Sequence, residues 1–174
     1  MPTFQVASAA ERSPPDIDTK NINTAIAWAA VTALLPWIET GHEPTPGLAV
    51  AFVFVAGIVF IRSALSDILD IQSDRLIGQE TIPVLIGEEK TLVLLQGISA
   101  LLFLLLVAAS PAGWSTSLSF VLLTSVFYIW ICFKLYDRRS GFSGVVLEGL
   151  LESSYIVAGL SSLLWLMAIN GTIA

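Results

Sequence analysis

Three aspartates, Asp67, Asp70 and Asp74, follow a long apolar stretch with the spacing D-x-x-D-x-x-x-D. If this segment is helical, the three positions fall within an arc of about 60° and span about 10 Å of the helix axis. Carboxylates that share one face repel one another unless water or a cation neutralises them. Oxygen ligands suit a hard ion such as Mg²⁺, which takes one or two carboxylates and adds water and substrate phosphates. The spacing therefore predicts a site for Mg²⁺ and a phosphate-bearing substrate at a membrane surface.

Two arginines flank this motif. Arg75 directly follows the last aspartate and carries a donor fork that suits phosphate. Arg62, which precedes the motif, either reaches the membrane interface or pairs with an acidic neighbour. The plainest alternative is that the aspartates form a solvated helix end. A calcium loop is excluded by the spacing, because an EF-hand needs acids at positions 1, 3 and 5.

The composition predicts a membrane protein. Of the 174 residues, 55% are hydrophobic and 13% are charged, whereas a soluble domain carries about 25% charged residues. The mean hydropathy is +0.81. Five stretches approach the roughly 20 apolar residues that cross a hydrocarbon core: Ile22–Ile38, Leu48–Leu65, Thr91–Ala109, Trp114–Phe133 and Ser153–Ile169. We therefore predict an all-α, polytopic membrane helix bundle with five transmembrane helices, with the lipid bilayer as partner and no nucleic acid.

The basic residues predict the orientation of these spans. All eight lie in alternate connections or, for Arg62, in the last turn of the span that leads into one: Arg12, Lys20, Arg62, Arg75, Lys90, Lys134, Arg138 and Arg139. By the positive-inside rule, the N-terminus and the aspartate motif are cytoplasmic and the C-terminus lies outside. Residues 1–20 contain no apolar signal segment and are predicted to be a flexible cytoplasmic lead-in to a membrane domain over residues 21–174.

Proline and glycine predict where the helices end. Pro36 should kink or end the first span. The connection after Asp67 should continue the second helix and break at Gly78. Because of Pro83, the run Thr81–Ile86 is a poor strand or helix, and an interfacial segment over the inner mouth of the bundle is favoured. In the last span, Glu152 and Tyr155 either face a cavity or lie at the membrane interface.

Residues 63–91, SALSDILDIQSDRLIGQETIPVLIGEEKT, resemble the second aspartate-rich motif of the UbiA superfamily of intramembrane prenyltransferases. The matching positions are the three aspartates followed by Arg75, Gly78, Thr81, Pro83 and Gly87. The segment AWAAVTALLP (27–36) looks similar to the fifth helix of that family. The resemblance therefore covers residues 20–174, as family helices five to nine.

This resemblance implies a nine-helix, all-α fold that binds an isoprenyl diphosphate through Mg²⁺ held by two aspartate motifs. The family transfers the isoprenyl group to an aromatic or other lipid-soluble acceptor. By this resemblance, Asp67, Asp70 and Asp74 are the catalytic and metal-binding residues. Arg75 is expected to bind the substrate with them, and we add Arg62 and Tyr155 as candidate substrate-binding residues.

The sequence departs from the family pattern in two ways. The first aspartate motif, N-D-x-x-D-x-x-x-D, does not occur in these 174 residues, and Gln79 and Glu80 stand where the family often has a basic residue. We therefore expect the isolated chain to be inactive until an N-terminal half chain, or a second copy in a homodimer, completes it. The main alternative is a non-catalytic, truncated membrane protein, either a pseudoenzyme or an interaction partner. A small transporter is disfavoured, because its acids should lie at mid-membrane.

Overall fold

The computed structural model describes residues 19–78, 80–115, 117–138 and 144–172. Every regular element in these ranges is helical. The elements are α1 (Lys20–Ala29), the π-helical turn η1 (Ala30–Leu34), α2 (Leu35–Thr40), α3 (Pro46–Leu69), α4 (Ile71–Ile77), α5 (Ile82–Ile86), α6 (Glu88–Ala109), α7 (Leu118–Asp137) and α8 (Gly144–Thr172). Residues 1–18, which hold nearly all of the expected lead-in, lie outside the described residues.

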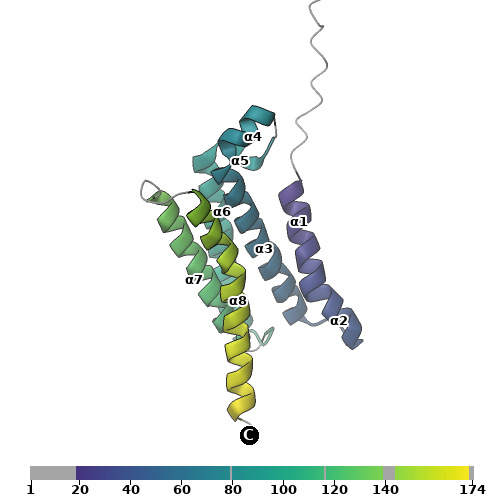
Figure 1. Cartoon of the computed structure of the whole chain (residues 1–174). Helices are drawn as coiled ribbons and strands as arrows, with labels where there is room; N and C mark the ends of the chain where they lie inside the picture. The colour runs from purple at the N-terminus through teal and green to yellow at the C-terminus, as the bar shows by residue number, and fades with distance from the viewer. Residues whose placement is uncertain (1–18, 79, 116, 139–143, 173–174) are drawn as a thin grey trace, which may run out of the picture.

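Five helical segments are long and apolar enough to cross a membrane: Lys20–Thr40, Pro46–Leu69, Glu88–Ala109, Leu118–Asp137 and Gly144–Gly171. They run side by side, and the short helices α4 and α5 gather at the end where α3 finishes and α8 begins (Figure 1). The described chain ends at the opposite end of the bundle. The predicted all-α bundle with five spans is confirmed, and the chain is an integral membrane protein.

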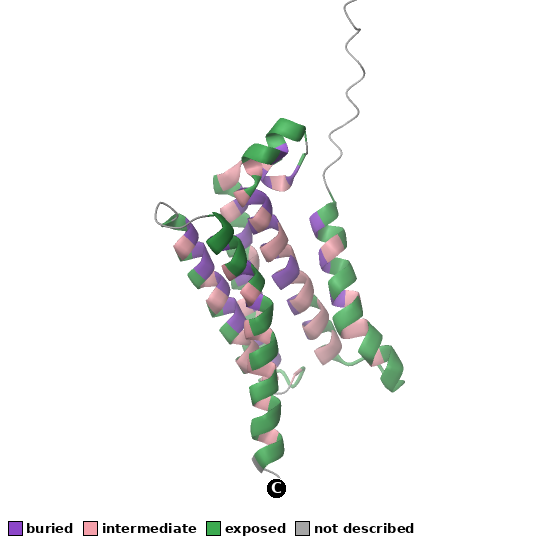
Figure 2. Ribbon diagram, in the orientation of Figure 1, coloured by how far each residue is buried: buried purple, intermediate pink, exposed green. Residues whose placement is uncertain are grey.

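Helix α3 lies at the centre of the bundle. It packs against α1, α6 and α8, while α6 packs on α7 and α7 packs on α8. The apolar core lies among α3, α6, α7 and α8, and its most completely buried large side chains are Ile61, Leu65, Leu95, Leu106 and Val126. Figure 2 shows buried positions along the inner faces of these helices and exposed positions on their outer faces.

Two helix contacts with α3 depend on small residues. Helix α1 turns Asn21, Ala25 and Ala29, which recur every fourth residue and are buried, toward α3. On the other side of α3, a Cβ added to Gly57 would lie 2.7 Å from a methyl group of Leu102 on α6. Small residues allow membrane helices to approach closely, and dispersion between their backbones then holds them together.

Pro36 does not end the first span. It lies in the first turn of α2 and follows the π-helical turn η1, and the helix continues to Gly41, whose φ of 65° closes it. A proline cannot donate to the carbonyl four residues earlier, and a wider turn is a known way to accommodate that lost bond.

The connection after α3 differs in two details from the sequence prediction. The helix is interrupted at Asp70, so α3 and α4 are separate helices, although the predicted break at Gly78 is present with φ 73°. The segment expected to be a poor helix contains α5, because Pro83 occupies its first turn, where no backbone donor is needed. Helix α5 contacts α3, α4 and α6 and so covers one end of the bundle.

Candidate functional site

The three aspartates have different surroundings. Asp67 lies on the last turn of α3 and Asp74 on α4, and both are buried. Asp70 is exposed at the junction of the two helices. Its amide donates to the Ser66 carbonyl oxygen at 3.1 Å, while its own carbonyl accepts from the Asp74 amide at 3.0 Å. The motif therefore bends at its middle residue and does not present one unbroken helical face.

Asp67 is held by the first span. The side-chain amide of Asn21, on the first turn of α1, donates to Asp67 Oδ2 at 2.6 Å. Asn21 Oδ1 in turn accepts a hydrogen bond from Ser63 Oγ at 2.6 Å. Ser63 and Asp67 lie four residues apart and are therefore neighbours on one face of α3. The buried side-chain amide of Asn21 contacts both of them.

Asp74 is held from the other direction. Its Oδ2 accepts a hydrogen bond from Thr81 Oγ1 at 3.2 Å, and Thr81 is the N-cap residue directly before α5. Asp74 therefore fastens α4 to the α5 segment, while Asp67 fastens α3 to α1. Arg75, the next residue after Asp74, is exposed on α4.

The donor chemistry at this end of the bundle suits a hard cation, because the carboxylate oxygens of the motif are the ligands that Mg²⁺ prefers. The described residues contain no group of three or more His, Cys, Asp or Glu side chains gathered to hold a metal. Mg²⁺ needs only one or two carboxylates when phosphate oxygens and water complete its shell. The residues therefore fit an ion that arrives with a phosphate-bearing substrate, but not a closed three-carboxylate cage.

A cavity of about 770 Å³ lies alongside α3, between α1 and α8. Its lining is mostly apolar, and the residues that line it are Trp28, Thr32, Ala51, Phe54, Val55, Ile58, Val59, Arg62, Leu118, Leu122, Glu152, Tyr155, Ala158, Gly159 and Ser162. Among the described residues that line it, Arg62 and Glu152 alone are charged. Arg62 lies about 7.5 Å along the α3 axis from Asp67, so the charged end of the cavity is the end nearer to the aspartate motif.

Arg62, Glu152 and Tyr155 meet at this end of the cavity. The Arg62 guanidinium forms an ion pair with the Glu152 carboxylate, across from α3 to α8. The central guanidinium carbon also lies 5.7 Å from the centre of the Tyr155 ring, within the range of a cation–π contact. Since Arg62 and Asp67 are separated by about 140° around α3, the arginine faces α8 while the aspartate faces α1.

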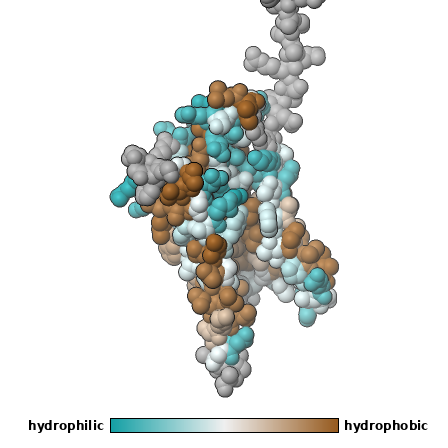
Figure 3. Space-filling view, in the orientation of Figure 1, coloured by the Kyte–Doolittle hydropathy of each residue, from teal (hydrophilic) through white to brown (hydrophobic). Residues whose placement is uncertain are grey.

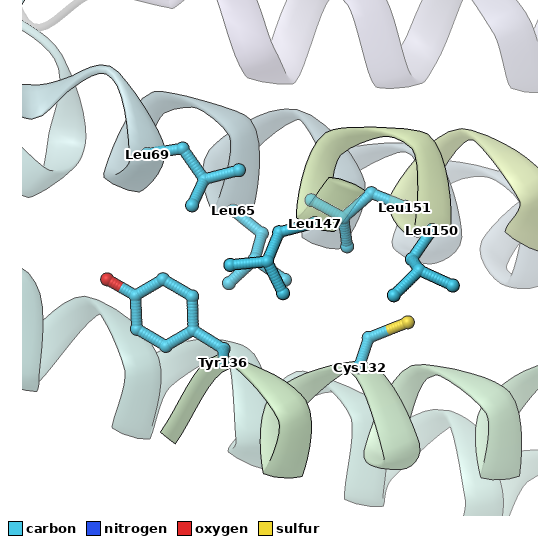
Figure 4. A pocket seen from close by; sticks show the side chains of 7 residues that line it. All are labelled: Leu65, Leu69, Cys132, Tyr136, Leu147, Leu150 and Leu151. Atoms are coloured by element: carbon cyan, nitrogen blue, oxygen red, sulfur yellow. The ribbon is translucent and has the colours of Figure 1, made fainter. Parts of the chain in front are cut away.

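A second hollow, of about 10 Å³, lies between α3, α7 and α8. Figure 4 shows that its lining side chains point toward one another from the three helices. They are Leu65, Leu69, Cys132, Tyr136, Leu147, Leu150 and Leu151. This space holds at most about one water molecule and has a fully apolar surface, so it is a packing defect of the core.

Hydropathy follows the same axis as the site. In the space-filling view, hydrophilic residues gather toward the end that carries α4 and α5, and hydrophobic residues dominate the outer part of α8 (Figure 3). Some apolar side chains nevertheless stand exposed at the hydrophilic end, among them Leu76 and Ile77 on α4. The carboxylates of the motif therefore lie where the apolar bundle gives way to a polar surface.

Sequence reasoning did not find Asn21 or Ser63 as partners of the motif, and it left Glu152 between a cavity and an interface. Asn21 is 46 residues away from Asp67, and no local pattern links the two. The signal that could have indicated its burial is its spacing. Asn21 lies four residues before Ala25 and eight before Ala29, so the three share one face of α1.

Comparison with protein families matches residues 21–146 to the model of the UbiA prenyltransferase family. The matched region covers well over half of the chain and includes the whole aspartate motif. It begins at Asn21 and ends within the first turn of α8. Comparison with curated proteins and with solved structures gives no match.

Proposed function

This chain belongs to the UbiA prenyltransferase family, and from that premise we propose that it serves Mg²⁺-dependent transfer of an isoprenyl group from an isoprenyl diphosphate to an aromatic or other lipid-soluble acceptor. Family membership indicates a prenyltransferase of the membrane in general. The observation that carries the finer proposal is the position of the large apolar cavity, whose charged end is the one nearer to the aspartate motif along α3.

An isoprenyl diphosphate has a strongly anionic head and an apolar tail, and the cavity offers a matching gradient. Its volume of about 770 Å³ lies within the range of roughly 300–1,000 Å³ that is usual for ligand pockets. The apolar wall formed by α3 and α8 suits the tail. The head would then lie beyond Arg62, against the carboxylates at the end of α3.

In this proposal, Asp70 would hold Mg²⁺ together with Asp67 or Asp74, because it is the exposed member of the motif. Bound Mg²⁺ would neutralise the diphosphate as negative charge builds on it. Arg75 would add a donor fork for a phosphate oxygen. Arg62 and Tyr155 would contact the substrate where its head meets its tail.

The reaction breaks the allylic C–O bond of the isoprenyl diphosphate, and the bonding electron pair leaves with the diphosphate. A new bond then forms between the allylic carbon and the acceptor, which loses a proton. A cavity with few polar groups slows capture of the allylic cation by water. Among the residues that line it, only Arg62 and Glu152 are charged, and they neutralise each other.

We further propose that another polypeptide segment supplies the first aspartate motif and four more helices. The resemblance of residues 20–174 to family helices five to nine supports this proposal, as does the position of the cavity between the first and last spans, α1 and α8. Helices that packed there would enclose the substrate. An N-terminal half chain is the favoured source, and a second copy in a same-orientation homodimer is the alternative.

The motif is tested by isothermal titration of the detergent-solubilised chain with geranyl diphosphate, with and without Mg²⁺. We expect Mg²⁺-dependent binding that Asp70→Asn weakens by more than about 10-fold, since even outer-shell partners of a metal contribute that much. Asp137→Asn, which alters an exposed aspartate at the end of α7, is the matched control and should bind like the wild type. Equal binding by the wild type and Asp70→Asn would identify the motif as a solvated helix end.

A second candidate function is that of a non-catalytic membrane protein that keeps part of the fold. It is favoured by the hydrogen bonds that already engage the Asp67 and Asp74 carboxylates with Asn21 and Thr81 inside the protein. This candidate predicts no Mg²⁺-dependent binding of geranyl diphosphate and no transfer activity with any complementing half.

A further inference from the structure

We propose that Asn21, on the first span, is a positioning residue that fixes the Asp67 carboxylate for Mg²⁺ and diphosphate, and that Ser63 fixes Asn21. This inference rests on the proposed function, because it assigns a role toward the same substrate. Neither residue belongs to the aspartate motif, and they reach Asp67 from α1 and from the preceding turn of α3.

The chemistry of the three side chains imposes a single order on the hydrogen bonds. An ionised carboxylate only accepts, so Asn21 must turn its NH₂ group toward Asp67. Its carbonyl oxygen then faces Ser63, where it must receive a hydroxyl hydrogen. The structure has this arrangement, with both donor–acceptor distances at 2.6 Å. The serine therefore prevents the amide from rotating, and the amide restrains the carboxylate.

The burial of these groups makes the arrangement costly to disturb. Asn21 is 2% exposed and Asp67 is 8% exposed. A polar group that is buried without its partner destabilises the folded protein, and a charged group does so more strongly. Loss of the Asn21 amide would remove one hydrogen bond that restrains the Asp67 carboxylate and would allow it to rotate or to shift toward water. Either movement changes where a carboxylate oxygen meets an incoming ion.

The position of Asn21 on α1 supports a role beyond helix packing. The next two turns of the same α1 stripe carry alanines, Ala25 and Ala29, which are sufficient for close contact with α3. An amide appears on this stripe only at the level of the aspartate motif. Asn23, two residues later, is exposed and makes only a local hydrogen bond to Thr19 Oγ1 at 3.3 Å.

The test compares four variants of the full chain: Asn21→Ala, Ser63→Ala, Asn23→Ala and Ala25→Val. Binding of geranyl diphosphate is measured by titration calorimetry while the Mg²⁺ concentration is varied, and folding is followed by thermal melting in detergent. Asn23→Ala controls for loss of an asparagine on α1. Ala25→Val controls for weakened packing of α1 on α3 with all three hydrogen-bonding groups intact.

We expect Asn21→Ala to weaken the Mg²⁺-dependent binding by about 10- to 100-fold, the loss typical of groups that orient a metal ligand. Ser63→Ala should weaken it less, because it removes only the restraint on the amide. Binding measured without Mg²⁺ should be the same in all variants. Asn23→Ala should behave like the wild type, and Ala25→Val should melt at a lower temperature while it binds normally.

Wild-type binding by Asn21→Ala would overturn the proposal, as would an equal loss of binding in Ala25→Val, which would show a structural role. If Asn21→Ala does not fold, Ser63→Ala decides, and normal binding by that variant overturns the proposal. Failure of the wild type itself to bind would contradict the proposed function and this inference together. That outcome is distinguishable, because it appears before any substitution is made.

Discussion

Arg62 and Glu152 place opposite charges within two membrane helices, and each compensates for the other. Neither is deeply buried: the side chains are 26% and 50% exposed toward the cavity. An ionisable residue inside a membrane helix is expensive and usually marks a substrate path or a pair. Here the two residues form a pair, and both also line the large cavity.

The two charges should therefore behave as a unit. Arg62→Met and Glu152→Met should each destabilise the protein, because each leaves one charge without its partner. The double variant should be more stable than the sum of the single effects predicts, by about 0.5–3 kcal/mol. A double-mutant cycle by thermal melting in detergent measures this coupling. Additive effects would show that the pair contributes nothing to stability.

At the scale of single residues, sequence reasoning found the aspartates but not what holds them. The three aspartates lie close together in the sequence, so their spacing can be recognised without the structure. The partners Asn21 and Glu152 come from the first and the last spans, and only tertiary packing brings them to α3. Arg62 was expected either to reach the interface or to pair with an acid, and the second expectation describes its contact.

Among the elements, the short helices at one end of the bundle depend on their glycine termini. Gly78 closes α4 with a φ of 73°, in the left-handed region that favours glycine. The turn sends the chain into α5, where Thr81 meets Asp74. The left-handed conformation of Gly78 thus helps to bring Thr81 into contact with Asp74.

Gly78→Ala should destabilise the protein by roughly 1–2 kcal/mol, the cost of a left-handed conformation for a residue with a Cβ. No atom lies within 4 Å of an added Cβ, so the loss comes from the backbone alone. Gly97→Ala on α6 is the matched control, because Gly97 is helical and also has open space around it. Thermal melting of both variants checks this. An unchanged melting temperature for Gly78→Ala would contradict the role given to the turn.

The sequence predicted the number of spans more accurately than it predicted the ends of the helices. Apolar runs mark the part of each helix that lies in hydrocarbon, but a helix continues as long as its polar residues find partners. Helix α8 begins at Gly144, nine residues before the predicted start at Ser153. The extra turns include Glu152, whose charge Arg62 neutralises. The break at Asp70 was not predicted either, since no proline or glycine marks it in the sequence.

For the whole molecule, the distribution of basic residues predicts that the α4–α5 end is cytoplasmic and that the C-terminal end of α8 lies outside. Cysteines introduced at Glu80 and Asn170, both exposed, should be labelled from opposite sides of the membrane. The buried Cys132 is first replaced by alanine so that it does not react. Labelling of both positions from the same side would contradict this orientation.

We propose that this chain provides the C-terminal half of a UbiA-type prenyltransferase. The most direct measurement is radiolabelled prenyl transfer in membranes that contain this chain, alone or co-expressed with the N-terminal half of a family member. We predict no measurable transfer by the chain alone and Mg²⁺-dependent transfer with the complementing half, abolished by Asp70→Asn. Robust turnover by the chain alone would contradict the half-enzyme account. Absence of transfer from a correctly assembled pair would contradict the catalytic role.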